Sequence, residues 1–483
     1  MKNSKKEETI KMEMILGGKK VAKSKMIKIY NPFNGEIVGE VPEGEPSDVE
    51  KAVELAEEGK KVMKELPLHK RVEILFNTGI LLEKNEHKIT DILVKEVGKT
   101  VNEAKSEVLR TADLFKYASE EAKRIHGETL PFSSVTGSEN KRGAYILEPV
   151  GIVGAITPFN VPLSLAAHKV APAIAAGNAV ILKPATQTPM NTLILGEILL
   201  EAGMPEKAIS VLTGRGSTVG NAIVEDPRIR FLSFTGSAET GKEIAKKAGI
   251  KKIGLELGSN APLIVMDSAN IDKAVRATVS GGFSVAGQIC ISVQRVFVHE
   301  KVYDIFIEKL VKKVKEIVFG DPAKEETVMG PVIDEQNAIR IIEWIKEAES
   351  KGGKILIGGK RNYTLVEPTV IIDAPLDSKI MQNELFGPAV AVRKVKNLDE
   401  AITLANQSVY GLQAGIFTKN IFEAFRAAQE IETGGVMINE GPRYRADFMP
   451  YGGYKMSGIG REGIKYAMEE MSEIKVICFD IGE

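Results

Sequence analysis

The chain has few of the residues that build disulfide-bonded or metal-dependent proteins. Its 483 residues include two cysteines, five histidines and one tryptophan. Two cysteines cannot form a disulfide framework, and five histidines leave little material for a metal site. We therefore expect no metal centre and a cytoplasmic protein.

Charge of one sign is also lacking, as is a long apolar run. Lys and Arg number 64 against 65 Asp and Glu, which leaves a net charge of −1. Such a chain has no field to attract nucleic acid or an anionic membrane. The longest uncharged run, residues 149–167, is broken by Pro158 and Pro162, so it does not resemble a membrane span. The polar start, residues 1–8, has no apolar stretch behind it and predicts no signal peptide.

What the chain does contain is enough apolar material, 43% of its residues, for large buried cores. Residues 46–126 carry helical periodicity and predict a helical layer. After Gly143 strands and helices alternate, which is typical of a parallel sheet covered on both faces. The strand-like runs are Gly151–Ile156, Ala179–Lys183, Ser210–Thr213, Phe231–Thr235 and Lys252–Leu257.

A second α/β stretch follows Pro262, and two further strand-like runs, Arg142–Leu147 and Ser472–Asp480, lie outside both series. The fold class is thus α/β, with a doubly wound parallel sheet and a second α/β domain. A nucleotide site is expected at the carboxyl ends of the parallel strands.

Two residues could carry covalent chemistry. Cys290 follows glycine-rich sequence, which lets backbone approach a ligand closely, although a lone cysteine in apolar surroundings is often a small core residue. Glu256 ends an apolar strand, where a carboxylate is costly to bury unless it is paired or works as a base. An ion-paired strand end is the alternative for Glu256.

Polar residues follow the other predicted strands. Asn160, in a loop fixed by two prolines, either donates its amide to an oxyanion or caps the next helix. Lys183 either binds a ribose or phosphate or is a solvated strand end. Gly236 and Ser237 open a helix, where free N–H groups bind phosphate, or Ser237 is a plain N-cap. Gly214 begins a glycine pattern that departs from the dinucleotide fingerprint.

Six segments occur in one succession: ITPFN (156–160), LKP (182–184), FTGS (234–237), LELG (255–258), GQIC (287–290) and ELFGP (384–388). In this order and at these separations the chain closely resembles the aldehyde dehydrogenase superfamily over about residues 26–478. The likeness is nearest to lactaldehyde and non-phosphorylating glyceraldehyde-3-phosphate dehydrogenases.

The resemblance implies an aldehyde dehydrogenase-like fold with a β-strand arm that joins subunits into a homodimer or homotetramer. The implied parts are an NAD(P)-binding domain (26–130 and 148–255), a catalytic domain (256–445), an oligomerisation arm (131–147 and 465–483) and an N-terminal extension (1–25).

The resemblance also implies the residue roles. Cys290 would attack the aldehyde carbon, Asn160 and the Cys290 N–H would hold the oxyanion, and Glu256 would activate the water that hydrolyses the thioester. The cofactor, NAD or NADP, would contact Ile156, Thr157, Pro158, Lys183, Thr186, Gly214, Gly236, Ser237, Gly241, Leu257, Glu384 and Phe386.

Departures from the family pattern bear on the cofactor and the product. Relatives strict for NAD often have Glu at the position of Thr186, and without that carboxylate NADP is acceptable. Relatives that pass the thioester to coenzyme A typically lack the glutamate found here as Glu256, so a carboxylic acid product is expected.

The substrate predicted is a small polar aldehyde of the lactaldehyde, glycolaldehyde or glyceraldehyde-3-phosphate type. Arg443, Arg445 and Arg295 are candidate contacts to an anionic or hydroxylated substrate; for Arg443 and Arg445, surface or interface salt bridges are the alternative. Other readings are a succinic semialdehyde or a phosphono- or sulfo-acetaldehyde dehydrogenase, a coenzyme A-acylating relative, and a homologue without catalysis.

Overall fold

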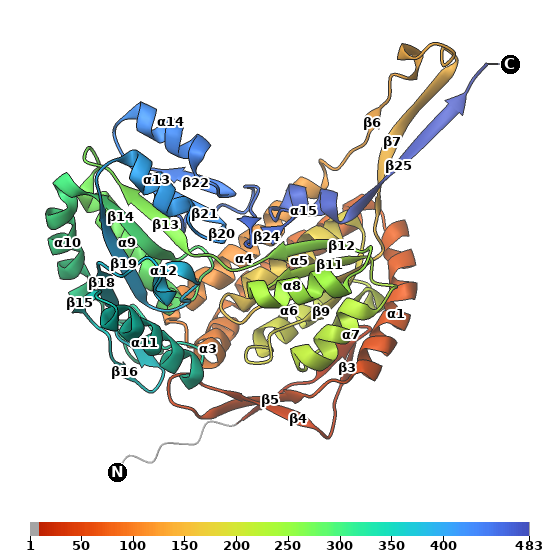
Figure 1. Ribbon diagram of the computed structural model, residues 1–483. Coiled ribbons are helices and arrows are strands. Elements are labelled where there is room, and N and C mark those ends of the chain that lie inside the picture. The colour runs from red at the N-terminus through yellow and green to blue at the C-terminus, as the bar shows by residue number, and fades with distance from the viewer. Residues whose placement is uncertain (1–8, 483) are drawn as a thin grey trace.

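The computed structural model describes residues 9–482, and its chain folds around two separate sheets with a projecting arm (Figure 1). The first sheet has eight strands, and its five central strands are parallel. In order across the sheet they are β24 (Gly458–Ile459), β12 (Lys252–Glu256), β11 (Phe231–Thr235), β8 (Ile152–Ile156), β9 (Ala179–Lys183), β10 (Ile209–Val211), β2 (Met14–Leu16) and β3 (Lys19–Val21). All five predicted strands of this series are present.

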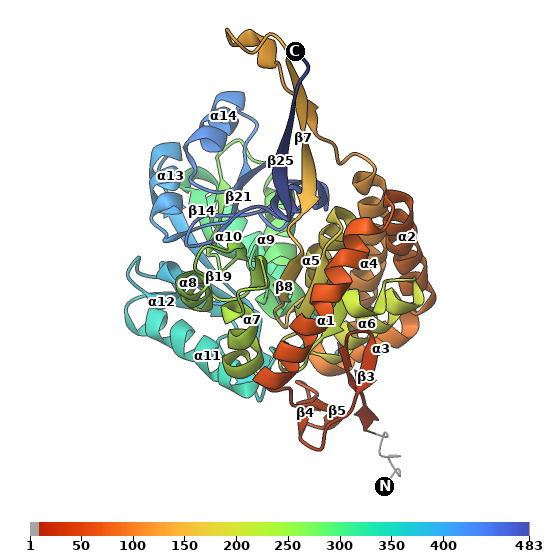
Figure 2. The ribbon, with the colours of Figure 1, turned by 90° about the vertical axis from the view of Figure 1, so that its right-hand side faces the viewer.

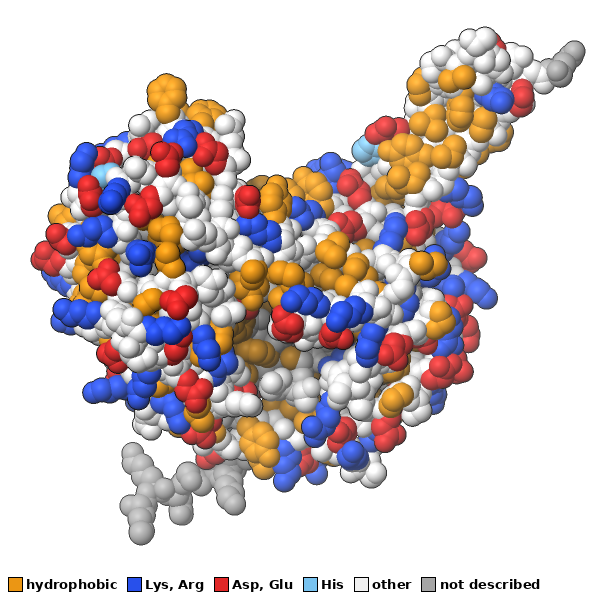
Figure 3. Space-filling model, in the orientation of Figure 1, with side chains coloured by type: hydrophobic (Ala, Val, Ile, Leu, Met, Phe, Trp, Pro, Cys, Tyr) orange, Lys and Arg blue, Asp and Glu red, His pale blue; other side chains and the backbone are white. Residues whose placement is uncertain are grey.

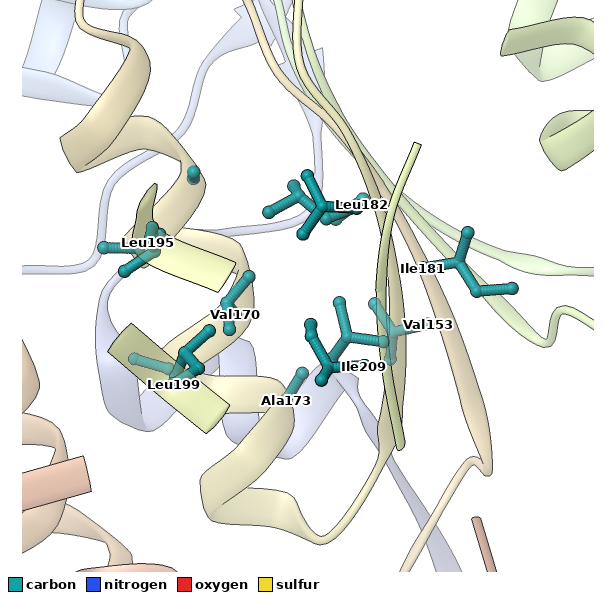
Figure 4. Close-up of a cluster of buried hydrophobic side chains, with 14 of the residues drawn as sticks. Val153, Val170, Ala173, Ile181, Leu182, Leu195, Leu199 and Ile209 are labelled. Atoms are coloured by element: carbon teal, nitrogen blue, oxygen red, sulfur yellow. The ribbon is translucent and has the colours of Figure 1, made fainter. Parts of the chain in front are cut away.

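Helices pack on this sheet because its strands are apolar on both faces. Neighbours in β9, Ile181 and Leu182, point to opposite faces, and Leu182 lies with Val153 and Ile209 toward Val170 and Leu199 of two covering helices (Figure 4). These helices are α5 (Pro162–Ala176) and α6 (Met190–Glu201), and the others of this part are α1 (Pro46–Glu65), α2 (Leu68–Lys84), α3 (Glu86–Val97), α4 (Val101–Ala122), α7 (Asn221–Glu225), α8 (Ala238–Lys247) and α15 (Ile464–Glu470). The predicted helical layer is α1 to α4, of which α2, α3 and α4 form an outer layer against α5 and α6.

The second sheet has seven strands, six of them parallel. They are β15 (Lys354–Ile357), β18 (Thr369–Ile372), β19 (Ala389–Val395), β14 (Val293–His299), β13 (Ala261–Val265), β21 (Gln413–Phe417) and β22 (Gly435–Ile438). Its helices are α9 (Ile271–Phe283), α10 (Glu300–Lys315), α11 (Glu335–Ser350), α12 (Lys379–Gln382), α13 (Leu398–Asn406) and α14 (Ile421–Glu430). The predicted α/β fold with two sheets is confirmed.

Each sheet has its own apolar core. The first core runs from Met14 to Leu257 and also takes in residues of α15, while the second runs from Leu263 to Ile431. Residues 14–21 of the predicted N-terminal extension therefore belong to the first sheet, and residues 1–8 lie outside the described residues. The space-filling view shows a hollow between the two lobes (Figure 3).

The arm is built by the two strands that the sequence left outside both series. β25 (Ser472–Asp480) pairs antiparallel along the whole of β7 (Lys141–Pro149), and β6 (Glu128–Thr129) lies on the other side of β7. The arm projects from the body in both ribbon views (Figures 1 and 2). Orange apolar side chains gather on the arm in Figure 3. The exposed apolar residues of its strands include Ile146, Ile474, Val476 and Phe479.

Short strands complete the fold. They are β1 (Ile10–Lys11), β4 (Met26–Tyr30), β5 (Ile37–Pro42), β16 (Arg361–Asn362), β17 (Leu365–Val366), β20 (Tyr410–Gly411) and β23 (Tyr454–Lys455). Among residues 9–482, no helix is long and apolar enough to cross a membrane.

Candidate active site

The predicted site residues of the first sheet meet at one edge. Ile156 lies beside both Phe234 of β11 and Lys183 of β9, and Thr235 lies beside Glu256. Because these strands are parallel, the loops that follow them emerge together. The Gly236 N–H donates to the Glu256 carbonyl at 3.0 Å, which joins two of these loops directly.

The segment before Cys290 has an unusual backbone. Val285, Ala286 and Gly287 have φ values of 50°, 52° and 70°, a left-handed run that is costly for a β-branched residue. The run is held from outside, since the Val285 N–H donates to Glu103 Oε1 at 2.7 Å. A Cβ on Gly287 would lie 2.2 Å from the Gly387 carbonyl oxygen, so only glycine fits there.

Gln288 holds the segment just before Cys290 in place. Its amide nitrogen donates to the Val285 carbonyl at 3.0 Å, and its amide oxygen accepts from the Ile333 N–H at 2.9 Å. The chain is thus held on both sides of the turn that presents Cys290.

Cys290 is enclosed by apolar side chains and one phenol. Its Sγ lies 3.0 Å from the Tyr451 hydroxyl oxygen, within a small cluster formed with Ile289, Ile291 and Leu412. Burial raises the pKa of the Cys290 thiol to about 12, against the lowering effect of the Tyr451 hydrogen bond. Burial therefore favours the thiol form of Cys290 over the thiolate.

Asn160 reaches the loop that precedes Cys290. Its Nδ2 donates to the Gln288 carbonyl at 2.7 Å, which leaves its second amide N–H free to donate. The alternative, helix capping, does not occur: the N-cap of α5 is Val161, and Glu107 accepts from the first-turn amides of Leu163 and Ser164. The Cys290 backbone N–H also makes no hydrogen bond within residues 9–482.

Glu256 is buried at the end of β12, and its Oε2 has no hydrogen-bond partner among the described residues. Burial, and next the carboxylate of Glu462, raise the pKa of Glu256 well above its usual range. Arg445 and Lys169 act in the opposite direction. A carboxylate in this environment is suited to accept a proton near neutral pH.

An ion-paired network lies behind Glu256. Glu462 bridges Lys169 and Arg445, each at 3.0 Å, and all three side chains are more than nine-tenths buried. Arg445 also lies 3.7 Å above the centre of the Tyr451 ring. Arg445 therefore forms a salt bridge, but a buried one and not the predicted surface or interface pair. Arg445 also borders the cleft described below.

The predicted adenosine contacts lie together. Lys183 is buried, its Nζ donates to the Pro184 carbonyl at 3.0 Å, and burial lowers the pKa of Lys183 to about 8. Thr186 donates to the Gly214 carbonyl at 3.1 Å, which joins the loop after β9 to the glycine-containing segment that begins at Gly214. Two donors of the Lys183 ammonium stay available for a ribose or phosphate.

At the next strand, Ser237 is the N-cap of α8 and accepts from the Thr240 N–H at 3.2 Å. The plain-cap alternative is thus present, and it leaves the amides at the helix start free for a phosphate. Gly241 has a packing role that the sequence did not reveal: a Cβ there would lie 2.5 Å from Leu257 Cδ2.

Glu384 and Phe386 enter from the second domain. Glu384 accepts from the Ser259 N–H at 2.8 Å, and burial raises the pKa of Glu384 to about 7. Phe386, with φ of 51°, packs edge-on against Phe159, their ring centres 5.8 Å apart. The contact of Phe159 with Phe386 joins segments far apart in the sequence, so no local pattern predicts it.

These residues fit a nicotinamide dinucleotide. Donors with free N–H groups stand at the carboxyl ends of β9 and β11, and a carboxylate for a ribose faces them from the second domain. When bound, NAD⁺ or NADP⁺ supplies the acceptor for a hydride.

A cleft of about 570 Å³ opens beside Cys290. Its wall includes Ile289 and Ile291, which flank Cys290, and residues of α4 and α9. The basic side chains in the wall are Lys99, Arg110, Arg443 and Arg445. Three of these are paired, with Glu107, Asp447 and Glu462 respectively. Arg443 makes no hydrogen bond or ion pair within residues 9–482, and the residue is exposed.

Arg295 is not among the residues of the cleft wall. It is buried, and its guanidinium donates to the carbonyls of Asn260, Leu404 and Ala405, each at 3.0 Å. These contacts tie the end of α13 to β13 and β14, so the structure gives Arg295 a structural place instead of the predicted substrate contact.

The fold and site together point to a nucleotide-dependent enzyme: a partly buried thiol, a side-chain amide and a buried carboxyl group lie together at the edge of a parallel sheet. Comparison with known proteins gives a match to the aldehyde dehydrogenase family over residues 20–477. By this match the chain belongs to the aldehyde dehydrogenase family.

Individual relatives cover nearly the whole chain. The 3-sulfolactaldehyde dehydrogenase of Priestia aryabhattai is 43% identical over 94% of this chain and 95% of its own. The lactaldehyde dehydrogenase of Methanococcus aeolicus is 43% identical over 94% and 97%. The NADP complex of glyceraldehyde-3-phosphate dehydrogenase GapN from Methanocaldococcus jannaschii superposes with a TM-score of 0.92 at 40% identity, over 95% of this chain and 100% of that one. The predictions of family, fold and NAD(P)-dependent oxidation of a small polar aldehyde are confirmed.

Proposed function

We propose that this chain oxidises a small aldehyde that has a hydroxyl group on the carbon next to the aldehyde group and, in some cases, an anionic group as well. Lactaldehyde, glycolaldehyde, glyceraldehyde-3-phosphate and 3-sulfolactaldehyde are aldehydes of this type. The observation that carries this proposal is Arg443, an unpaired guanidinium in the cleft that leads to Cys290. Lactaldehyde, 3-sulfolactaldehyde and glyceraldehyde-3-phosphate are also the substrates in the names of three relatives.

In the proposed reaction, the Cys290 thiolate attacks the aldehyde carbon and forms a thiohemiacetal. The free amide N–H of Asn160 and the backbone N–H of Cys290 donate to the oxygen that carries the developing charge. A hydride then passes from the thiohemiacetal carbon to the nicotinamide that bound NAD⁺ or NADP⁺ would supply, which leaves a thioester on Cys290. Glu256 then removes a proton from the water that attacks the thioester, which releases the acid and the thiol.

The first sheet with its core is proposed as the NAD(P)-binding domain and the second as the catalytic domain, since Lys183 and Ser237 belong to one and Cys290 to the other.

The presence of Glu256 favours hydrolysis of the thioester over its transfer to coenzyme A. Formation of reduced cofactor and acid from a panel of lactaldehyde, glycolaldehyde, glyceraldehyde-3-phosphate, succinic semialdehyde and propanal, without coenzyme A, tests the proposal. Fastest turnover of propanal, or of no panel member, would contradict it.

Replacing Arg443 should lower kcat/KM for a charged aldehyde more than for a neutral one. Arg443→Met is expected to lower kcat/KM for glyceraldehyde-3-phosphate about 10- to 200-fold, the value of a lost charge-assisted hydrogen bond. For neutral lactaldehyde the change should stay within about threefold. Arg230→Met, at the opposite, amino end of β11, is the matched control. Equal losses for both aldehydes would return Arg443 to a structural role.

Replacing Thr186 should change the choice of cofactor. Thr186→Glu places a carboxylate where a 2′-phosphate is expected, and like charges there cost several kcal/mol. We expect KM for NADP⁺ to rise more than about tenfold while KM for NAD⁺ changes little. Thr186→Gln, similar in shape but neutral, is the control. If both variants raise KM for NADP⁺ equally, side-chain size and not charge is responsible.

We also propose that the arm joins chains into a homodimer or homotetramer. Since β25 is an edge strand with exposed Ile474, Val476 and Phe479, a partner surface would cover both its backbone and its apolar side chains. Light scattering in solution tests this proposal, and a measured mass of one chain, 52.5 kDa, would refute it.

We also propose a cytoplasmic location, which the low cysteine content supports and cell fractionation would test.

A further inference from the structure

Tyr451 contacts the Cys290 thiol directly but has no part in the reaction proposed above. Its hydroxyl oxygen lies 3.0 Å from Cys290 Sγ, and its ring is 4% exposed. From this geometry we propose that Tyr451 is a further catalytic residue, whose phenol donates a hydrogen bond to the Cys290 thiolate and so increases the population of the nucleophile. The inference rests on the proposed role of Cys290.

The direction of this hydrogen bond follows from the protons available. A thiol and a phenol can each donate, but a thiolate has no proton, so in the reactive state the phenol must be the donor. Burial raises the pKa of Tyr451 well above its usual range, so the phenol keeps that proton. A hydrogen bond to an ionised group is the stronger kind, and it favours the thiolate over the thiol.

Tyr451 is held in place from two sides. Its backbone N–H donates to the Glu462 carbonyl at 2.9 Å, and its carbonyl accepts from the Glu462 N–H at 2.7 Å. Arg445, paired with the carboxylate of Glu462, stacks 3.7 Å from the centre of the Tyr451 ring. A cation over the ring draws electron density from it and makes the phenol a better donor.

Other charges around the thiol show why such a donor is needed. Burial disfavours the thiolate most, and the nearby carboxyl groups of Glu384 and Glu256 also raise the pKa of Cys290. Arg445 opposes them through space, and Tyr451 opposes them by direct contact. Within residues 9–482, Tyr451 is the one side chain that makes a hydrogen bond with Cys290 Sγ.

The test measures the thiol without aldehyde or cofactor. Because the chain has two cysteines, a Cys478→Ser background leaves Cys290 as the single thiol. Below the midpoint of thiol ionisation, the rate of alkylation by iodoacetamide follows the thiolate fraction. Loss of a hydrogen bond to an ionised group corresponds to about one to two pKa units. The greater reactivity of a more basic thiolate offsets about half of this on a logarithmic scale.

Tyr451→Phe in that background is therefore expected to alkylate about three- to tenfold more slowly between neutral pH and pH 9. Tyr454→Phe, the same change at a side chain that is 49% exposed, should leave the rate unaltered. An unchanged or faster rate in Tyr451→Phe, or an equal fall in both variants, would overturn the proposal. Failure of the nucleophile assignment would show separately, as turnover retained by Cys290→Ala.

Discussion

Cys290→Ala is expected to abolish aldehyde oxidation, with a fall in kcat of more than about 10⁴-fold, because the proposed thiohemiacetal and thioester both form on the Cys290 thiol. Cofactor binding should persist, since its proposed contacts Lys183 and Ser237 lie on the other sheet. Steady-state turnover and the fluorescence change on NADPH binding measure the two properties on the same protein.

Cys478→Ala is the matched control for this change. Cys478 is exposed on the arm strand β25, and its loss should leave kcat within about twofold of the parent. Turnover by Cys290→Ala at a tenth of the parental rate or more would remove Cys290 from the role of nucleophile.

Glu256→Gln is expected to stop the reaction one step later. The amide cannot accept a proton from water, so one equivalent of reduced cofactor should form rapidly and steady-state turnover should then fall about 10²- to 10⁴-fold. Stopped-flow absorbance of the reduced cofactor resolves the burst from the slow phase. A normal steady-state rate would show that another base activates the water.

The pH dependence gives an independent readout of the same residue. Burial and Glu462 raise the pKa of Glu256, so a larger fraction of it is protonated at neutral pH than for an exposed glutamate. Because the base works when ionised, hydrolysis of the thioester should accelerate as pH rises through this raised pKa. In Glu256→Gln that dependence should be absent.

The sequence predicted much of the fold because apolar strands and helical periodicity are local signals. All five strands of the first parallel series were predicted, and the two isolated runs pair as β7 and β25. Asn160, Cys290 and Glu256 could be proposed from the sequence because prolines flank Asn160, glycines precede Cys290 and Glu256 ends an apolar strand. The structure adds that Asn160 reaches the loop before Cys290 and does not cap α5.

Other assignments depend on contacts between distant parts of the chain. The three arginines looked alike in sequence, yet Arg295 donates to buried carbonyls, Arg445 pairs with Glu462, and Arg443 alone of the three is unpaired. Tyr451 was missed because nothing in its neighbours indicates that it approaches a residue 161 positions away. Such contacts depend on how distant parts of the chain pack together, and local sequence patterns do not predict them.

The left-handed run before Cys290 has a consequence for folding. Its shape is secured by hydrogen bonds that span 182 residues to Glu103, 45 residues from Gln288 to Ile333 and 161 residues from Cys290 to Tyr451. Closing such long loops is slow and entropically costly, and the strained conformation is not favoured until all of them are closed. The reactive geometry is therefore among the last features that the chain acquires. During refolding, recovery of catalysis should lag behind recovery of helical circular dichroism.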